Sequence, residues 1–230
     1  MTTKYEPVIW DIETTGLNPL AQYWWSNEMA AQVTAVGMAT VNGWRRSSNP
    51  DEVDIQVEVL YDSDEYRLLN VIKDRFWDMF IEAYNNGEPF DPEEEEIQPF
   101  LVGFNSRNYD HPYIGARYSR KRINGSPFSH GVKRLDMMRV AGKYGDLNNY
   151  PSQDDYAEFK GYPVEDEFDG SMMPEFFDKG HMDKIKAHAE RDVEELAKLF
   201  VSDREMAMEE FYDHYDIDKT PVFQTGVSEW

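Results

Sequence analysis

The sequence has no cysteine and no long apolar run. Without cysteine among its 230 residues, disulfide bonds and thiolate metal sites are excluded. No apolar run approaches the roughly 20 residues that a membrane-spanning helix needs, and the first residues lack the apolar segment of a secretory signal peptide. We therefore expect a cytoplasmic protein with no membrane partner.

Basic residues are scarce relative to acidic ones. The chain has 23 lysine and arginine residues against 45 acidic residues, a formal net charge of −22, and the acids are spread along its whole length. A dispersed acidic surface keeps a protein soluble but destabilises it through self-repulsion unless salt screens the charges. This pattern favours a halophilic protein over an acidic mesophilic one, and stabilisation by molar KCl would distinguish the two.

The length and composition favour one domain with a sizeable core. Hydrophobic residues make up 40% of the chain and aromatic residues 14%, which is ample for packing at this length. We assign residues 1–204 to this domain and residues 205–230, which are acidic and aromatic, to a C-terminal helix and tail extension.

Residues 8–12 predict a strand that is buried on both faces, because apolar residues dominate the run and Pro7 stands where a strand can begin. Side chains alternate along a strand, so Asp11 and Glu13 share one face. Two carboxylates there repel each other and are costly to desolvate. A divalent cation would relieve that cost, and two solvated acids at a strand end are the alternative.

Further strands and helices follow from hydrophobic periodicity. The turn Asn42-Gly43 predicts an antiparallel meander of the first three strands, and Ser63 is the expected N-cap of the first helix. Further strands are expected at 33–41, 54–61 and 100–104. Helices are expected at 64–84, 135–143, 151–160, 171–179 and 182–201. Irregular loops are expected at 20–32 and 93–96.

Polar residues stand at two junctions of this pattern. Asp110 precedes Pro112 at a predicted helix start, where helix capping is the alternative to a functional role. His188 and Asp192 lie one turn apart on one face of the last long helix, beside its apolar stripe.

The segment 112–145 inverts the charge pattern, with eight basic residues and Asp136 as its one acid. An ordinary solvated face is the alternative, but in a chain of net charge −22 we favour contact with a polyanion. Arg117 is the candidate substrate contact within this segment.

Three motifs together resemble those of the DEDD superfamily of 3′–5′ exonucleases, and most closely the proofreading domain of family B DNA polymerases and its stand-alone relatives. They are Asp11-Ile-Glu13-Thr-Thr-Gly, Gly103-Phe-Asn105 through Tyr109-Asp110-His-Pro-Tyr-Ile, and Asp169-Gly-Ser-Met-Met followed by Ile185-Lys-Ala-His188-Ala-Glu-Arg-Asp192. The likeness spans residues 8 to about 200. Its three motifs occur in the family's order and spacing.

The resemblance implies an α/β, ribonuclease-H-like fold, in which helices flank a mixed central sheet. It implies a metal-dependent 3′–5′ exonuclease acting on single-stranded or frayed DNA, with a replication or repair partner. Its two divalent cations, Mg²⁺ or Mn²⁺, are hard ions that prefer oxygen ligands. The implied metal ligands are Asp11, Glu13, Asp110 and Asp192. The implied contacts to the terminal nucleotide are Thr14, Thr15, Gly16, Leu17, Asn105 and Tyr109.

One residue departs from the family pattern. The polymerase-related domains carry tyrosine four residues before the last aspartate and another branch carries histidine five before it, whereas this chain has His188 four before Asp192. The implied role of His188 is to orient or deprotonate the attacking water. Since histidine titrates near 6.5 and tyrosine near 10, a catalytic histidine predicts a rate that falls on acidification and a His188→Phe variant that lacks this fall.

Three other functions stay open at the level of sequence. A 3′–5′ exoribonuclease would use the same fold and metals, and a nucleic-acid-binding protein with weak catalysis is compatible with histidine at the tyrosine position. An acidic structural protein would leave the basic segment 112–145 unexplained. The oligomeric state does not follow from the sequence.

Overall fold

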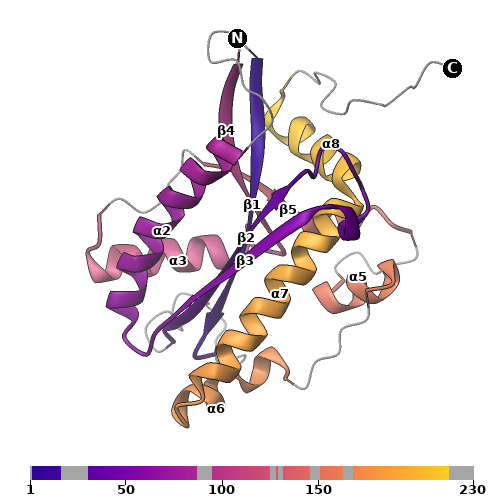
Figure 1. The fold of residues 1–230 in the computed structure, drawn as a ribbon. Helices are drawn as coiled ribbons and strands as arrows, with labels where there is room; N and C mark the ends of the chain where they lie inside the picture. Colours follow the sequence, from indigo (N-terminus) through magenta and orange to yellow (C-terminus); the bar gives the residue numbers. More distant parts are fainter. Residues whose placement is uncertain are drawn as a thin grey trace, which may run out of the picture.

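The protein, described from a computed structural model, has a five-stranded mixed sheet with helices on both faces (Figure 1). The structure describes residues 2–16, 31–86, 95–124, 128, 132–145, 151–162 and 168–217. The predicted α/β class with a mixed central sheet flanked by helices is confirmed. The strands are β1 (Thr2–Thr14), β2 (Val33–Asn42), β3 (Asp54–Tyr61), β4 (Glu95–Gly103) and β5 (Lys133–Asp136).

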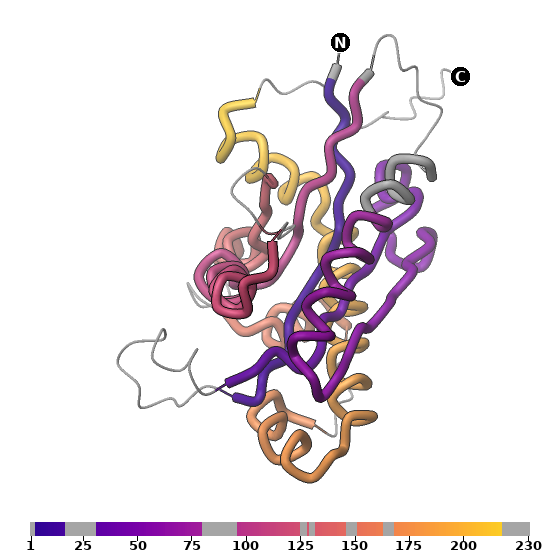
Figure 2. Tube along the Cα trace, turned by 90° about the vertical axis from the view of Figure 1, so that its left-hand side faces the viewer, coloured from indigo at the N-terminus to yellow at the C-terminus, as the bar shows by residue number. Residues whose placement is uncertain are grey.

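β1 is the central strand, in the order β3-β2-β1-β4-β5. β1, β2 and β3 form the predicted antiparallel meander, whereas β4 is parallel to β1 and β5 is parallel to β4. Figure 2 shows the first half of β1 running beside β4. Because β1, β4 and β5 run in the same direction, their carboxyl ends meet at one edge of the sheet, where α/β proteins commonly bind ligands.

Two apolar layers cover the sheet, one on each face. Val8, Trp10 and Ile12 of β1 pack toward α2 (Glu65–Asn86) and α3 (Asp110–Lys121). Tyr5 and Ile9 point to the other face, as the alternation of a strand requires, and pack with the C-terminal helices. Those are α7 (Met182–Ser202) and α8 (Arg204–Tyr215), together with α4 (Met137–Ala141) and α5 (Gln153–Lys160).

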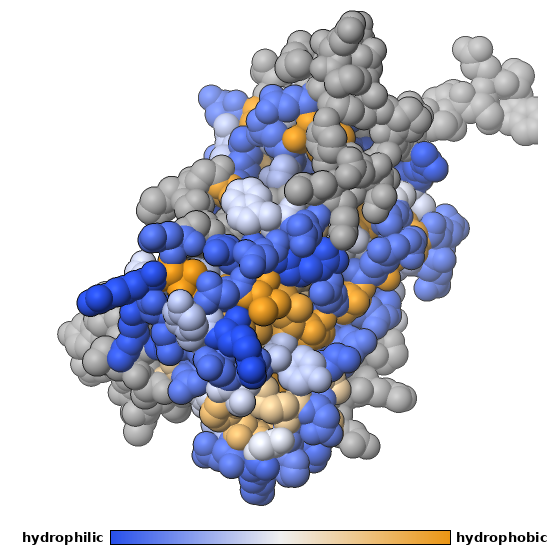
Figure 3. Space-filling view, turned by 60° about the vertical axis from the view of Figure 1, so that its left-hand side comes forward, coloured by the Kyte–Doolittle hydropathy of each residue, from blue (hydrophilic) through white to orange (hydrophobic). Residues whose placement is uncertain are grey.

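Short helical segments complete the described part of the chain. These are η1 (Pro50–Glu52), η2 (Gly170–Met172) and α6 (Met173–Asp178). No helix in the described ranges is long and apolar enough to cross a membrane. On the side shown in Figure 3, hydrophilic side chains cover most of the coloured surface, around a small hydrophobic group near its centre.

The C-terminal helix α8 belongs to the core. The Phe211 ring lies 4.4 Å from that of Phe100 in β4 and 5.1 Å from that of Tyr5 in β1, measured between centroids. α8 therefore packs directly on the central strands. The division of the chain at residue 204 stays a prediction, and residues 218–230 lie outside the described ranges.

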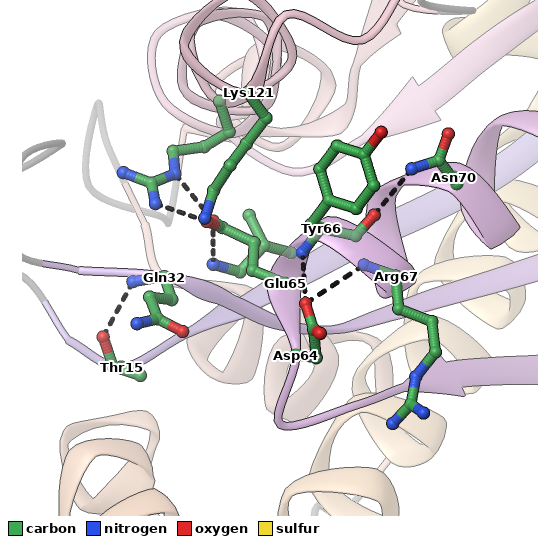
Figure 4. Close-up of polar contacts among 10 residues, drawn as sticks. Thr15, Gln32, Asp64, Glu65, Tyr66, Arg67, Asn70 and Lys121 are labelled. Atoms are coloured by element: carbon green, nitrogen blue, oxygen red, sulfur yellow. Dashed lines mark hydrogen bonds and ion pairs between the residues drawn. The ribbon is translucent and has the colours of Figure 1, made fainter.

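Two boundary predictions were wrong. Asp64, not Ser63, caps α2, since its Oδ1 accepts hydrogen bonds from the backbone N of Tyr66 (2.9 Å) and Arg67 (3.2 Å) (Figure 4). The predicted loop 93–96 overlaps β4, whose residues 95 and 96 pair with the start of β1. The rest of that loop, and residues 20–30 of the other predicted loop, lie outside the described residues.

β5 was not predicted, because its four residues Lys-Arg-Leu-Asp are too short and polar to show a strand pattern. It occupies the start of the helix expected at 135–143. That helix begins only at Met137, where the side chain of Asp136 accepts a hydrogen bond from Met138 N at 3.2 Å.

Gly37 allows α7 to approach the sheet closely. A Cβ atom at this position would lie 2.7 Å from the backbone oxygen of Ala189 and 3.1 Å from Val193 Cβ. Gly37 is also the β2 residue that pairs with Asp11. The absent side chain therefore lets α7 pack directly over the strand pair that carries Asp11.

A Gly37→Ala substitution is expected to reduce the free energy of unfolding by about 1–3 kcal/mol, because the helix backbone must move to admit the methyl group. Urea unfolding would measure this loss. Gly115→Ala is the matched control, because alanine is the better helix former at this position in α3. Apart from the adjoining residues and the backbone of α3, no atom of the described residues lies within 4 Å of the Gly115 Cβ position. Equal stability of the two variants would contradict the close approach.

Candidate active site

Four carboxylates from three elements meet at the carboxyl edge of β1. Asp11 and Glu13 come from β1, Asp110 is the first residue of α3, and Asp192 lies on α7. Charge repulsion links Glu13 to each of the other three. The structure thus brings together the four acids that the sequence singles out, and with His188 they are called the acid cluster below.

His188 faces two of the acids. Its Nε2 lies 3.7 Å from Glu13 Oε1 and 3.4 Å from Asp192 Oδ2. The ligand atoms of these three residues all lie within 4.8 Å of one another, which is compact enough to hold a metal ion. His188 and Glu13 are buried, and Asp192 is partly buried.

Burial and mutual repulsion disfavour the charged forms of the cluster. Burial, followed by the charge of Asp192, raises the pKa of Asp11 to about 8. Burial and the neighbouring acids also hold the pKa of Glu13 and of Asp110 well above their usual ranges. Glu13 Oε1 is buried and accepts no hydrogen bond from the described residues. Among the described residues, the cluster therefore has less cationic charge than four ionised carboxylates require.

The capping interpretation of Asp110 is wrong. Asp110 is the first residue inside α3, and the cap position belongs to Tyr109, whose side chain makes no capping hydrogen bond. Asp110 is only 4% exposed. The charges of Asp11 and Asp136 act on its carboxylate, which also interacts with its own backbone N–H.

Arg191 is a member of the site that the sequence analysis missed. Its Nη2 donates a hydrogen bond to Asp192 Oδ1 (2.6 Å) and lies 3.3 Å from His188 Nδ1. Arginine can only donate, so Nδ1 must accept and the hydrogen of a neutral His188 ring stays on Nε2. Arg191 also partly offsets the repulsion at Glu13. Its spacing of three residues from His188 on one helix was the available signal.

Three predicted nucleotide contacts lie beside the cluster. The side chains of Tyr109 and Thr14 are hydrogen-bonded to each other, and burial raises the pKa of Tyr109, with a smaller contribution from the charge of Glu13. The backbone N of Gly16 donates to Thr14 Oγ1 at 3.4 Å. Gly16 has φ +97°, and a Cβ there would lie 2.3 Å from Pro174 Cγ, so only glycine fits between β1 and α6. Leu17 lies outside the described residues.

Thr15 and Asn105 shape the backbone around the cluster. Thr15 Oγ1 accepts a hydrogen bond from Gln32 N at 2.8 Å (Figure 4), which ties the end of β1 to the residue before β2. Asn105 has φ +52° in the turn between β4 and α3. Its backbone N donates to Asp136 Oδ1 at 2.8 Å.

Asp136 is a second residue that the sequence analysis did not assign to the site. Besides Asn105, it accepts a weaker hydrogen bond from Arg107 N at 3.4 Å, so it holds the turn that leads to Asp110. Its charge contributes to the raised pKa of Asp110. The sequence signal that could have identified Asp136 was its position as the one acid in the basic segment 112–145.

Arg117 does not lie in the acid cluster. It is 4% exposed, and its Nε donates to Glu65 Oε1 at 2.6 Å while its Nη2 pairs with Glu65 Oε2. Glu65 also accepts from Val33 N at 2.9 Å and pairs with Lys121 Nζ at 3.1 Å (Figure 4). Burial would raise the pKa of Glu65, but Arg117 and these other donors outweigh it and lower the pKa. Arg117 thus joins α3 to α2, and we do not carry it into the proposed substrate site.

Removing the positive charge of Arg117 is expected to destabilise the protein strongly. Arg117→Met would leave Glu65, which is 2% exposed, without its main partner, at a cost of about 3–5 kcal/mol in the free energy of unfolding. Chemical denaturation would measure it. Arg120→Met, an exposed change in the same helix, should alter stability by less than about 0.5 kcal/mol. Similar losses in both variants would refute the buried ion pair.

Ion pairs within the protein account for part of the basic segment. Arg117 and Lys121 pair with Glu65, and Arg139 and Lys143 pair with Glu210 of α8. Both carboxylates lie outside the segment 112–145. The local excess of positive charge in the sequence is therefore smaller in the folded protein.

Comparisons with known proteins give two similarities. No known family model matches this chain. The chain is 28% identical over 199 residues to the uncharacterized protein MJ0365 of Methanocaldococcus jannaschii, a match that covers 83% of this chain and 90% of that protein. A solved structure of exonuclease I aligns with 92% of this chain at 10% identity and a TM-score of 0.47. This chain spans 43% of the length of that exonuclease I chain.

Proposed function

We propose that this protein is a metal-dependent 3′–5′ exonuclease with a ribonuclease-H-like fold, acting on single-stranded DNA or frayed 3′ ends. The observation that supports this most directly is the acid cluster itself. Its carboxylates, of which Glu13 and Asp110 are buried, repel one another, and Glu13 Oε1 lacks a hydrogen-bond donor among the described residues. A cluster of this kind destabilises the fold unless a cation neutralises it.

The residues present fit divalent metal ions. All four carboxylates offer hard oxygen donors, which suit Mg²⁺ or Mn²⁺, and we assign Asp11, Glu13, Asp110 and Asp192 as the ligands of two ions. Two such ions, when bound, supply activation of water and neutralisation of charge at the leaving oxygen of a phosphodiester.

His188 and Arg191 orient the groups around the reacting phosphate. With Nδ1 of His188 facing the Arg191 donor, the Nε2 hydrogen points toward Glu13 and Asp192. A neutral ring in this tautomer donates a hydrogen bond and does not accept one at Nε2. The geometry therefore favours orientation of the attacking water over its deprotonation by His188. Arg191 also fixes Asp192 through a charge-assisted hydrogen bond.

The end of β1 and the start of α3 would hold the terminal nucleotide. Tyr109 offers an aromatic ring next to the acids, and its ring is stacked on that of Tyr113 with centroids 5.8 Å apart. Aromatic rings bind the faces of bases in single strands without regard to sequence. Thr14, Thr15, Gly16, Leu17 and Asn105 complete the proposed contacts of this nucleotide.

A labelled-strand assay tests the proposal. Single-stranded DNA and RNA of equal sequence, labelled at the 5′ end, are incubated with Mg²⁺ or Mn²⁺ in low and in molar KCl. We expect the DNA to shorten stepwise, and EDTA to stop the reaction. Faster shortening of RNA would make the protein an exoribonuclease. Binding of either strand without shortening in any condition would refute the nuclease proposal and favour a binding protein.

A further inference from the structure

A basic cavity lies at the same edge of the sheet as the acid cluster. It has a volume of about 540 Å³, within the range of roughly 300–1,000 Å³ typical of ligand pockets. Its walls come from the turn before α3, from the end of β5, and from α4 and the residues after it. They include Arg107, Asn108, Asp136, Met138, Arg139 and Lys143, and we call this cavity the basic pocket.

The basic pocket concentrates positive charge on an acidic protein. Arg107, Arg139 and Lys143 line it, in a chain of net charge −22. Two of these cations share one carboxylate, since Glu210 lies 3.4 Å from Arg139 Nη1 and 3.0 Å from Lys143 Nζ. Asp136 also lines the pocket, so two carboxylates stand against three cations, and the remaining positive charge can attract a further anion.

The cations of the basic pocket differ in how they are held. The Arg107 guanidinium contacts the ring of His214 and the backbone oxygen of Arg134, which fixes it against β5 and α8. The side chains of Arg139 and Lys143 are 52% and 34% exposed. Two reachable cations beside one fixed cation suit a phosphate group, whose oxygens take several charge-assisted hydrogen bonds.

Asp136 links the basic pocket to the acid cluster. Asp136 lines the pocket, and its charge also acts on Asp110. Arg107 and Asn108 lie in the turn between Asn105 and Asp110. Because β1, β4 and β5 are parallel neighbours, their carboxyl ends present the cluster and the pocket along one edge.

We propose that the basic pocket binds a backbone phosphate of the nucleic-acid strand whose 3′ end occupies the acid cluster. The inference rests on the proposed function, since it places the strand that the cluster would shorten. Without bound metal, the acids repel the backbone of the strand, and the pocket offers a compensating attraction beside the acid cluster. This proposal gives a role to Arg139 and Lys143, the basic residues of the segment 112–145 that line the pocket.

Binding of fluorescent DNA in EDTA tests the pocket without cleavage. At 50–100 mM salt, we expect an Arg139→Gln/Lys143→Gln variant to bind an eight-nucleotide strand about 10–100-fold more weakly, with a shallower salt dependence. Binding of a dinucleotide should change less than about twofold. Glu210→Gln, which removes the competing carboxylate, should bind the longer strand more tightly.

The matched control removes two exposed charges from the far end of α3. Arg120→Gln/Arg122→Gln has the same change in net charge, and we expect it to weaken binding of the eight-nucleotide strand less than about threefold. Equal weakening by both double variants would reduce the effect to net charge and overturn the pocket. The pocket proposal would also be overturned if a free mononucleotide bound more tightly than the strand and if the pocket variant lost that mononucleotide binding. Melting temperatures show whether each variant is folded. If Arg139→Gln/Lys143→Gln does not fold, the single variant Lys143→Gln replaces it.

Kinetics separate this inference from the proposed function. With Mg²⁺ or Mn²⁺, the pocket variant should raise the KM for the longer strand about tenfold or more and leave kcat within about twofold. Shortening with an unchanged KM would overturn the pocket and leave the exonuclease standing. If the wild-type protein cleaved nothing but its strand binding still depended on the pocket, the pocket would stand and the exonuclease proposal would fail.

Discussion

Asp110→Asn is expected to lower the rate of nucleotide release by about 1,000-fold or more, which corresponds to at least 4 kcal/mol of transition-state stabilisation. The substitution keeps the size of the side chain and removes one of the four carboxylates of the acid cluster. Since the cluster is proposed to hold two metal ions, a lost ligand should reduce metal occupancy together with the rate.

Single-turnover cleavage of labelled DNA at several Mn²⁺ concentrations would measure this effect. Asp78→Asn is the matched control, because Asp78 is an exposed acid on α2 and its loss changes the net charge equally. The control should retain the wild-type rate within about twofold. If Asp110→Asn retained more than about a tenth of that rate, the acid cluster would not be the catalytic centre.

The metal-free protein is expected to lose stability as the pH rises from about 4 to about 8. The pKa of Asp11 rises from 3.8 to about 8 on folding, and those of Glu13 and Asp110 rise as well. In that pH window the folded state holds more protons than the unfolded state, so the free energy of unfolding falls as the pH increases. The contribution is fully present below pH 4 and lost above pH 8, at about 1.4 kcal/mol for each pKa unit.

Divalent cations should reverse this loss. Melting temperatures measured at constant ionic strength are expected to rise with Mn²⁺ or Mg²⁺ at pH 8 and to change little at pH 5, since protonated acids do not bind metal. Asp11→Asn should raise the melting temperature of the metal-free protein at pH 8, by roughly 3–10 °C. The proposed electrostatic strain would be contradicted if the metal-free wild-type protein were equally stable at pH 5 and pH 8 and the Asp11→Asn variant also showed no difference between the two pH values.

The parts of the fold that the sequence predicted correctly are those set by local patterns. The alternation around Asp11 gives β1 its two buried faces, and the apolar stripe of 182–201 matches α7 closely. β5 escaped prediction because an edge strand of four residues shows little periodicity. The cap of α2 was misplaced by one residue because serine and aspartate are both good caps.

The site was predictable where one element carries the residues and less so where distant segments meet. The spacing of Asp11 to Glu13, and of His188 to Asp192, fixes each pair on one face. Arg117, by contrast, has its partner Glu65 on another helix, so no local pattern reveals that its charge is already neutralised. Arg139 and Lys143 share Glu210 for the same reason.

The acid cluster joins the first strand to the last long helix, through the close approach of Ala189 to Gly37. Asp11 and Asp192 are therefore separated by most of the described chain, and any fragment that contains the whole cluster must include residues 11–192. A ribosome that has made β1, β4 and α3 has produced three of the four carboxylates and still lacks the helix that completes them. The proposed chemistry of this protein, and the electrostatic strain of its metal-free form, thus both begin only after α7 has been synthesised.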